Sequence, residues 1–183
     1  MIAHLPLAAL VVVASALDVT SEGARPGPAA ATIADAHAGQ TPRESRGPEA
    51  WAAVDIDGRP WTDRRLRGRV VLLDFWATWC APCLDDLPRL KRLHAQHASR
   101  GLTIIGVSLD RSPLRDFRSW LQRQGIAWPQ VREIGLYDSP LARAFDVQAI
   151  PASFLFDREG RLQATSLRGE ALDRRVSALM ETR

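Results

Sequence analysis

The stretch "VVLLDFWATWCAPCLDDLP", residues 70–88, decides the fold of this chain. Its first part, residues 70–76, is an apolar run interrupted by one aspartate, which is typical of a buried central strand. A helix is expected over residues 82–98, because leucines recur there every three positions and give it one apolar side. Cys80 and Cys83, the only cysteines of the 183 residues, therefore lie where a strand gives way to a helix.

The spacing of these two cysteines predicts thiol-disulfide chemistry. At the start of the helix the Cys80 sulfur faces unpaired backbone N–H groups and the positive end of the helix dipole, which lowers the pKa of its thiol. The offset of three residues brings Cys83 back beside it across one helical turn. We expect Cys80 to attack a substrate and Cys83 to resolve the mixed disulfide. Pro82 suits the first turn, where its missing N–H costs nothing.

Two other uses of the cysteines are less favoured. A tetrahedral zinc site needs two further ligands, and none of the four histidines belongs to a second Cys-x-x-Cys or a paired metal motif. A purely structural disulfide that closes so short a loop would restrict the unfolded chain little. The sequence therefore predicts a redox-active pair, with no metal and no cofactor.

Strands and helices alternate along the rest of the chain, and no internal repeat is present. The expected elements are a hairpin over residues 51–61 turning at Asp57-Gly58, a strand at 102–109, a helix started by Ser112 and Pro113 and ended by Gly125, a short helix from Ser139-Pro140 to Phe145, strands at 152–157 and 161–167 around a turn at Glu159-Gly160, and a last helix with Leu172, Val176 and Leu179 on one face. This order predicts a three-layer α/β sandwich.

The N-terminal part has a different character. Residues 1–17 contain no Asp, Glu, Lys or Arg, and the apolar run at 5–17 is short for a membrane-spanning helix, so we expect a signal peptide or an N-terminal anchor. Residues 18–48 are rich in Ala, Gly, Pro, Ser and Thr and are expected to be a flexible linker. The folded domain is predicted to occupy residues 49–183.

The charge pattern does not indicate a nucleic-acid partner. The net charge is +3, and the 23 arginines are spread along the whole chain. The densest basic stretch, "RRLRGR" at residues 64–69, is interpreted as a solvated turn before the first buried strand.

Several of these motifs together resemble a known family. Trp-Cys-x-Pro-Cys at residues 79–83, Pro88 in the following helix, the "VSLD" segment with an extra helix after it, and "VQAIPASFLFDREGRL" are similar to the TlpA/ResA-like thiol-disulfide oxidoreductases of the thioredoxin superfamily. The resemblance covers residues 51–180. It implies a thioredoxin-like sandwich with a central mixed sheet, an N-terminal hairpin and an extra helix-strand insertion.

The resemblance also implies the parts of the substrate site. It makes Ile150-Pro151 a cis peptide that packs against the disulfide, where the preceding backbone can pair with an extended substrate segment. Trp79 and Pro82 flank the cysteines and are expected to contact substrate. Trp76 is expected to frame the site by packing.

Two aspartates near the motif are candidate proton-transfer groups. Asp74 interrupts the apolar strand, so we expect it to be buried beneath the cysteines with a raised pKa. It resembles the buried acid of thioredoxins, a general base for the resolving thiol; an exposed strand-end carboxylate is the alternative. TlpA/ResA-like proteins usually have a glutamate near the active site at the position of Asp86. The side chain of Asp86 is shorter, so the alternative to that role is a solvated carboxylate on the helix. Asp85 is expected to be exposed.

The resulting hypothesis is an extracytoplasmic thiol-disulfide oxidoreductase that acts as a monomer. The resemblance implies that it reduces partner proteins, such as apocytochromes before haem attachment, and that a membrane thiol-transfer protein re-reduces it. Two alternatives stay open: a peroxidase of related fold, and a copper-delivery or metal-binding module that uses both thiols.

Overall fold

Two parallel strands form the centre of the computed structural model, which describes residues 50–182. β3 (Val70–Trp76) and β4 (Leu102–Ser108) pair in register, with Val70 opposite Leu102 and Trp76 opposite Ser108. Nearly every residue of both strands is buried. This two-sided burial explains why their sequences are continuous apolar runs without polar alternation.

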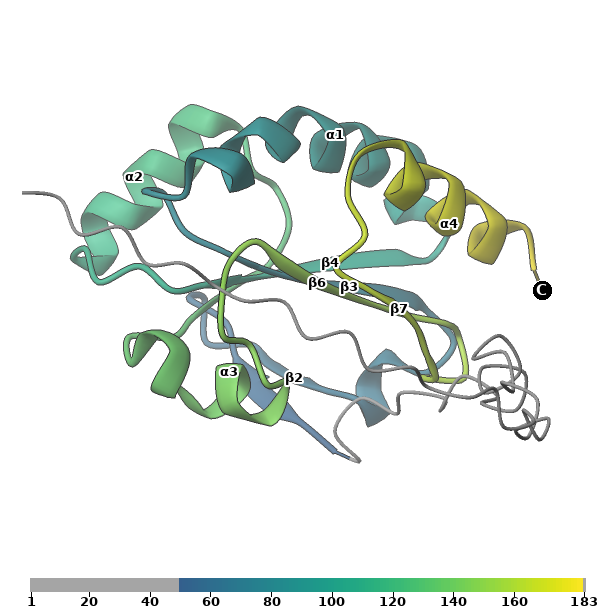
Figure 1. Ribbon diagram of the computed structural model, residues 1–183, viewed down its shortest axis with the longest axis horizontal. Coiled ribbons are helices and arrows are strands. Elements are labelled where there is room, and N and C mark those ends of the chain that lie inside the picture. The colour runs from purple at the N-terminus through teal and green to yellow at the C-terminus, as the bar shows by residue number, and fades with distance from the viewer. Residues whose placement is uncertain (1–49, 183) are drawn as a thin grey trace, which may run out of the picture. The chain divides into compact units, whose positions relative to one another are not determined.

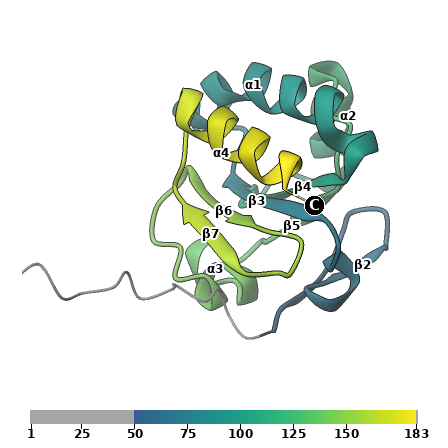
Figure 2. The ribbon, with the colours of Figure 1, turned by 90° about the vertical axis from the view of Figure 1, so that its right-hand side faces the viewer.

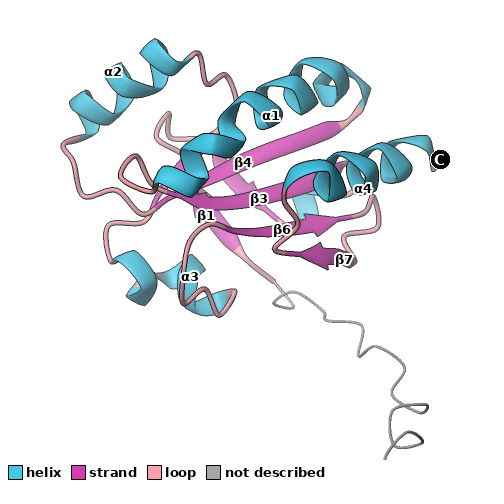
Figure 3. Ribbon diagram, turned by 45° about the horizontal axis from the view of Figure 1, so that its top comes forward, coloured by secondary structure: helices cyan, strands magenta, loops and turns pink. Residues whose placement is uncertain are grey.

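The central sheet is mixed, as the resemblance implied. Its order is β5-β4-β3-β6-β7, in which β5 (Gln130–Arg132) runs parallel to β4, while β6 (Ala152–Phe156) and β7 (Leu162–Thr165) form an antiparallel hairpin beside β3. A separate antiparallel hairpin joins β1 (Ala52–Val54) and β2 (Pro60–Thr62). Figure 3 shows the strands of the sheet in magenta, seen obliquely, with α1 and α2 above them and α3 below.

Helices cover both faces of this sheet and complete a three-layer thioredoxin-like sandwich (Figures 1 and 2). One face carries α1 (Ala81–His97), α2 (Leu114–Gln124) and α4 (Gly169–Glu181), and the other carries α3 (Pro140–Ala144) and the β1-β2 hairpin. Short 3₁₀ turns occur at Arg64–Leu66, Ala98–Arg100 and Leu136–Asp138. The predicted α/β sandwich is confirmed.

Alternate residues of β3 pack into two different cores. Val70 and Leu72 belong to a cluster with leucines of α1 and the apolar face of α4. Val71, Leu73 and Phe75 belong to a second cluster on the α3 side. Successive strand residues point to opposite faces, so even-numbered positions of β3 face α1. Asp74 shares that parity, which places it on the same side as the helix that carries Cys83.

Two details differ from the sequence prediction. The residue pattern did not locate β5, because a strand of three residues is too short to show a period; the resemblance implied only an extra helix-strand insertion without bounds. α2 begins at Leu114, and Pro113, with an extended ψ of 142°, is its N-cap, so Ser112 lies outside the helix instead of capping it. The Ser112 carbonyl accepts a hydrogen bond from Arg132. Gly125 ends α2 with a positive φ of 62°, as predicted.

The N-terminal predictions lie outside the described residues. These are the signal peptide or anchor at 1–17 and the linker at 18–48. All described residues belong to one compact unit. The domain bounds 49–183 stay a prediction. Within residues 50–182, no helix is both long enough and apolar enough to cross a bilayer.

Candidate active site

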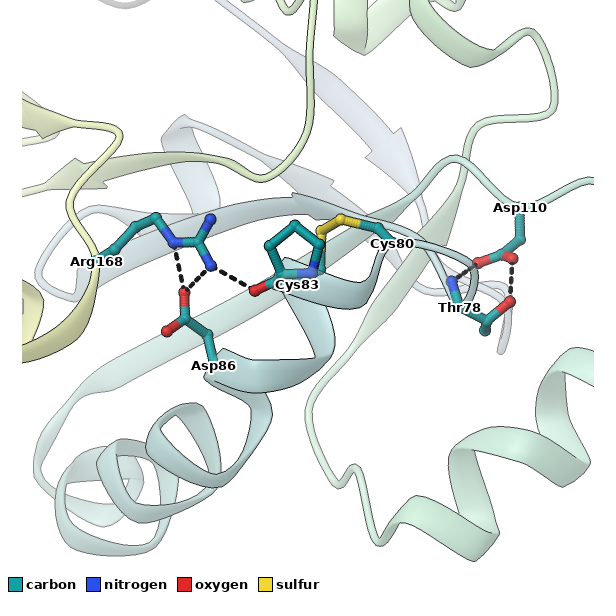
Figure 4. The surroundings of a disulfide bond; sticks show 7 residues. Thr78, Cys80, Cys83, Asp86, Asp110 and Arg168 are labelled. Carbon is teal, nitrogen blue, oxygen red and sulfur yellow. Dashed lines mark hydrogen bonds and ion pairs between the residues drawn. A yellow bond between two sulfur atoms is a disulfide. The ribbon is translucent and has the colours of Figure 1, made fainter.

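A disulfide joins Cys80 and Cys83 at the junction of β3 and α1. Cys80 is the N-cap of α1, and its carbonyl accepts hydrogen bonds from the N–H groups of Cys83 at 3.0 Å and Leu84 at 3.1 Å. The two Cα atoms are 5.3 Å apart, and the sulfurs are bonded (Figure 4). Pro82 lies in the first turn, as predicted. The strand-to-helix turn therefore holds both sulfurs at the positive end of α1.

Aromatic side chains line the inner side of the disulfide. Trp76 is buried in a cluster with both cysteines, and its ring lies 5.4 Å from that of Trp120. The Trp76 Nε1–H donates to Gln130 Oε1 at 3.0 Å. Trp79, by contrast, is 57% exposed. The structure thus places Trp76 as packing around the site and leaves the Trp79 ring open to a partner.

The loop before β6 also reaches the disulfide. The Ile150-Pro151 peptide is cis, as the resemblance implied. Ile150 is partly buried and packs against the cluster that contains both cysteines. β6 begins at the next residue, Ala152, which pairs with Phe75 of β3. Ile150 is therefore brought to the cysteines by the same sheet that carries the active-site strand.

Asp74 lies in the middle of the sheet, between Gly106 of β4 and Ser153 of β6. Burial and, to a smaller extent, the negative charge of Asp86 raise the pKa of its carboxyl, while Arg168 acts in the opposite direction; the resulting pKa is about 7. The carboxyl can therefore gain or lose a proton near neutral pH. The raised pKa agrees with the expectation from the sequence.

Asp86 is held in an ion pair that the sequence did not predict. Arg168, the residue before α4, places its Nε 2.8 Å and its Nη2 2.7 Å from Asp86 Oδ2, and Nη2 also donates to the Pro82 carbonyl (Figure 4). Asp86 is partly buried, whereas Asp85 beside it is exposed, as expected. No local pattern marks Arg168, because it contacts α1 from 82 positions farther along the chain.

A carboxylate that the sequence did not predict holds the turn before Cys80. Asp110 is 2% exposed and accepts hydrogen bonds from the Thr78 N–H at 3.0 Å, the Thr78 hydroxyl at 2.5 Å and the Ser108 hydroxyl at 2.8 Å. It lies two residues after the end of β4, in the "VSLD" segment. A carboxylate at the end of a buried strand was the available signal. Figure 4 shows Asp110 and Arg168 on opposite sides of the disulfide.

The acidic and sulfur groups of residues 50–182 form no candidate metal centre. No cluster of three or more His, Cys, Asp or Glu side chains in this part of the chain could hold a metal ion. His94 and His97 lie in the last turn of α1. His94 faces the Trp128 ring at 5.7 Å, so it packs in the helix layer far along α1 from the cysteines.

The family follows from a comparison with family models. A model described as the AhpC/TSA family matches residues 46–165. The chain belongs to this family. The match includes the cysteines, Asp74, Asp86, Asp110 and the cis proline.

Among named proteins, the chain is similar to thiol-disulfide oxidoreductases. The chain is 31% identical over 109 residues to the thiol-disulfide oxidoreductase ResA of Geobacillus thermodenitrificans, covering 60% of each chain, and 29% identical over 108 residues to ResA of Bacillus subtilis, covering 59% of this chain and 58% of that one. It therefore spans about three fifths of the length of these relatives.

Solved structures show the same fold. The thioredoxin domain of a thiol-disulfide oxidoreductase from Bacteroides vulgatus superposes with a TM-score of 0.65 at 27% identity, covering 75% of this chain and 99% of that one. A thiol:disulfide interchange protein of the thioredoxin family from Chlorobium tepidum superposes with a TM-score of 0.62 at 27% identity, covering 74% and 95%. These likenesses agree with the thioredoxin-like sandwich seen in the described residues.

Proposed function

We propose that this protein is a thiol-disulfide oxidoreductase that works through the Cys80/Cys83 couple. The observation that carries the proposal is the position of the disulfide, with Cys80 as the N-cap of α1 and Cys83 inside the first turn. A helix N-terminus stabilises a thiolate, and a second thiol within bonding distance can resolve a mixed disulfide. The similarity to named thiol-disulfide oxidoreductases supports the same activity.

The proposed reaction exchanges two electrons in two steps. In the reduced protein, the Cys80 thiolate attacks one sulfur of a substrate disulfide, which forms a mixed disulfide and releases the other substrate sulfur as a thiolate. Cys83 then loses its proton and attacks the Cys80 sulfur, which releases the second substrate thiolate and closes the protein's own disulfide. The two released thiolates take up protons, so the substrate is reduced by two electrons and the protein is oxidised by two.

Nearby groups supply proton transfer and substrate contact in this scheme. Asp74 takes the proton of Cys83, because a carboxyl whose pKa is about 7 is ionised in half of the molecules at neutral pH. Asp86, one helical turn after Cys83 in α1, is the second carboxylate of the proposed proton-transfer site. Trp79, Pro82, Ile150 and Pro151 form the contact surface for the substrate chain around the sulfurs.

The setting of the reaction extends the proposal. The apolar run at residues 5–17 supports export, as a cleaved signal peptide or an anchor, and hence an extracytoplasmic site of action. Reduction of partner proteins, such as apocytochromes before haem attachment, would need a membrane thiol-transfer protein as donor in an oxidising compartment. We propose that the protein acts on these partners as a monomer.

Catalysed insulin reduction with dithiothreitol as donor tests the activity. The wild-type protein should accelerate precipitation of the insulin B chain, and Cys80→Ser should abolish the acceleration. Cys83→Ser should instead accumulate a mixed disulfide, visible as an adduct by mass spectrometry under non-reducing conditions. Insulin reduction that survives Cys80→Ser would refute the assignment.

Peroxide consumption by the reduced protein separates the proposal from a peroxidase. A thiol-disulfide oxidoreductase should consume hydrogen peroxide no faster than an equal concentration of Cys80→Ser protein with free glutathione added. Fast, Cys80-dependent peroxide consumption with slow insulin reduction would favour the peroxidase. Titration of the reduced protein with Cu(I) makes the corresponding test of a copper carrier, which should bind tightly and turn over disulfides poorly.

A further inference from the structure

We propose that Arg168 is a positioning residue for disulfide exchange, which fixes the Asp86 carboxylate and the Pro82 carbonyl beside Cys83 and so sets the charge that Asp74 experiences. The inference rests on the proposed function and adds a residue to it. Arg168 lies 85 positions after Cys83 in the chain, and it belongs to no recognisable sequence motif. It touches no sulfur, so its role is exerted through the groups that it holds.

The contacts of Arg168 span one turn of the active-site helix. Its Nε and Nη2 both lie within 2.8 Å of Asp86 Oδ2, and Nη2 donates to the Pro82 carbonyl as well. Pro82 lies between the two cysteines, and Asp86 lies four residues later on the same side of α1. One planar guanidinium therefore joins the Cys-x-x-Cys turn to the carboxylate that follows it, a geometry that lysine cannot reproduce.

The segment that carries Arg168 is itself attached to the strand beside Asp74. Ser153 of β6 is paired with Asp74 in the sheet. The Ser153 hydroxyl donates to the Leu167 carbonyl at 3.1 Å, and its carbonyl accepts from the Ser166 N–H at 2.7 Å. These two bonds hold the residues just before Arg168, so the guanidinium is delivered from a fixed backbone. Asp74 is thus linked through β6 to Arg168, and Arg168 is linked through Asp86 to α1, the helix that contains Cys83.

Few charged side chains surround Asp74, Asp86 and Arg168, and the sign of each charge is known. Asp86 acts on Asp74 to favour its protonated form, and Arg168 acts to favour its ionised form. On α1, Asp85 is exposed and Arg89 is paired with Asp173 of α4. At the start of α4, Glu170 is exposed and pairs with Arg174. Removing only Arg168 therefore leaves the negative charge of Asp86 without its positive partner. Removing only Asp86 leaves the positive charge of Arg168 without its negative partner.

The opposite signs make the test specific. The pH dependence of insulin reduction should be measured for wild type, Arg168→Gln, Asp86→Asn and the double variant. The Arg168→Gln profile should move to higher pH by about half a unit or more, and the Asp86→Asn profile should move to lower pH. The double variant should lie between the two. The equilibrium constant for reduction of Arg168→Gln by glutathione should fall about threefold, because a positive charge beside the thiols favours the reduced form.

Arg89→Gln is the matched control. It removes a nearby ion pair between α1 and α4, Arg89 with Asp173, which holds no group of the Cys-x-x-Cys turn. Its pH profile and glutathione equilibrium should equal those of wild type. Arg168→Lys keeps the charge without the two-headed contact, so it should restore the pH profile and only part of the turnover rate. This variant also serves if Arg168→Gln does not fold.

The outcomes separate this inference from the proposed function. If wild type does not reduce insulin at all, the proposed function fails first. If wild type turns over and Arg168→Gln matches Arg89→Gln in both pH profile and glutathione equilibrium, the role of Arg168 is refuted while the function stands. A shift of the Arg168→Gln and Asp86→Asn profiles in the same direction would equally overturn it.

Discussion

Two aspartates, one within β3 and the other just after β4, show how differently one protein treats carboxylates that are shielded from solvent. Asp74 lies within the apolar strand β3, and Asp110 lies two residues after the end of the buried strand β4. Asp110 accepts three hydrogen bonds, from Thr78 and Ser108. Asp74 has no hydrogen bond among the causes that shift its pKa, and burial raises that pKa to about 7.

The comparison shows that hydrogen-bond donors, together with burial, decide what such a carboxylate does. A carboxylate surrounded by fixed donors is a structural acceptor, because those donors would lose their partners without it. A carboxylate without donors in the same sheet is free to exchange a proton. Asp110 therefore holds the turn that leads to Cys80, while Asp74 supplies chemistry on the Cys83 side.

The largest expected effect is on the pH dependence of stability at Asp74. Its carboxyl has an ordinary pKa of 3.8 and a folded-state pKa of about 7, so between these values only the folded state holds the proton. Stability conferred by that proton is full below pH 3.8 and is lost as the pH rises to about 7, in total about 4 kcal/mol. Asp74→Asn should remove this loss, so urea unfolding of the oxidised variant should give the greater free energy above pH 7.

The exposed neighbour Asp85 provides the control for that measurement. Asp85→Asn removes a carboxylate from the same region without changing a buried group, so its curve should run parallel to that of wild type. Equal pH slopes for Asp74→Asn and wild type would show that Asp74 keeps an ordinary pKa, and the contrast with Asp110 would then disappear.

The sequence predicted Asp74 and missed Asp110, for a physical reason. A single aspartate inside an apolar strand can be recognised locally, and so can the Cys-x-Pro-Cys turn and the central strands, whereas the cis proline before β6 was implied only by the family resemblance. Thr78 and Asp110 come from separate segments, 32 positions apart, and only the pairing of β3 with β4 brings them together. Arg168 reaches Asp86 across 82 positions, and the three residues of β5 are too few to show a period.

Asp110 should produce the next largest effect, on stability alone. Asp110→Ala leaves the Thr78 N–H and two hydroxyl groups without their acceptor in a buried site, which should lower the free energy of unfolding by about 3 kcal/mol. Denaturation of the oxidised protein at several pH values measures this. The difference in unfolding free energy between Asp110→Ala and wild type should be the same above and below pH 7, because both proteins contain Asp74 and share its pH dependence. Asp110→Asn keeps one oxygen and should lose less; a loss under about 1 kcal/mol for Asp110→Ala would contradict the structural role.

Asp157, in the β6-β7 turn, should give a smaller effect with the opposite pH sign to Asp74. Burial alone would raise the pKa of its carboxyl, but hydrogen bonds from the Arg161 N–H, the Arg161 side chain and Gln163 together lower it. Its stabilisation is therefore present above pH 3.8 and lost as the pH falls through the lowered folded-state pKa. Asp157→Asn should cost about 1.5 kcal/mol at pH 7 and less in acid.

Glu159→Gln is the control for Asp157, since Glu159 pairs with the same Arg161 from an exposed position. It should change stability by under about 0.5 kcal/mol at any pH. Thermal unfolding from pH 3 to pH 7 compares the variants. An Asp157→Asn deficit that grows toward acid would mean that donors do not determine the sign, and the comparison of Asp74 with Asp110 would lose its generality.

Trp79 should have the smallest effect on stability and a selective effect on substrate. Its side chain is 57% exposed, so Trp79→Ala should change the free energy of unfolding by no more than about 0.5 kcal/mol. It should also leave the pH midpoint of insulin reduction unchanged, because the ring is neutral, while the KM for insulin rises severalfold through lost contact area.

Trp76→Phe is the contrasting variant: it removes the hydrogen bond to Gln130 inside the aromatic cluster, so it should destabilise the protein and leave KM near wild type. If Trp79→Ala instead shifted the pH midpoint, the ring would be shielding Asp74 from water, and the raised pKa of that carboxyl would depend on the exposed surface as well as on its place in the sheet.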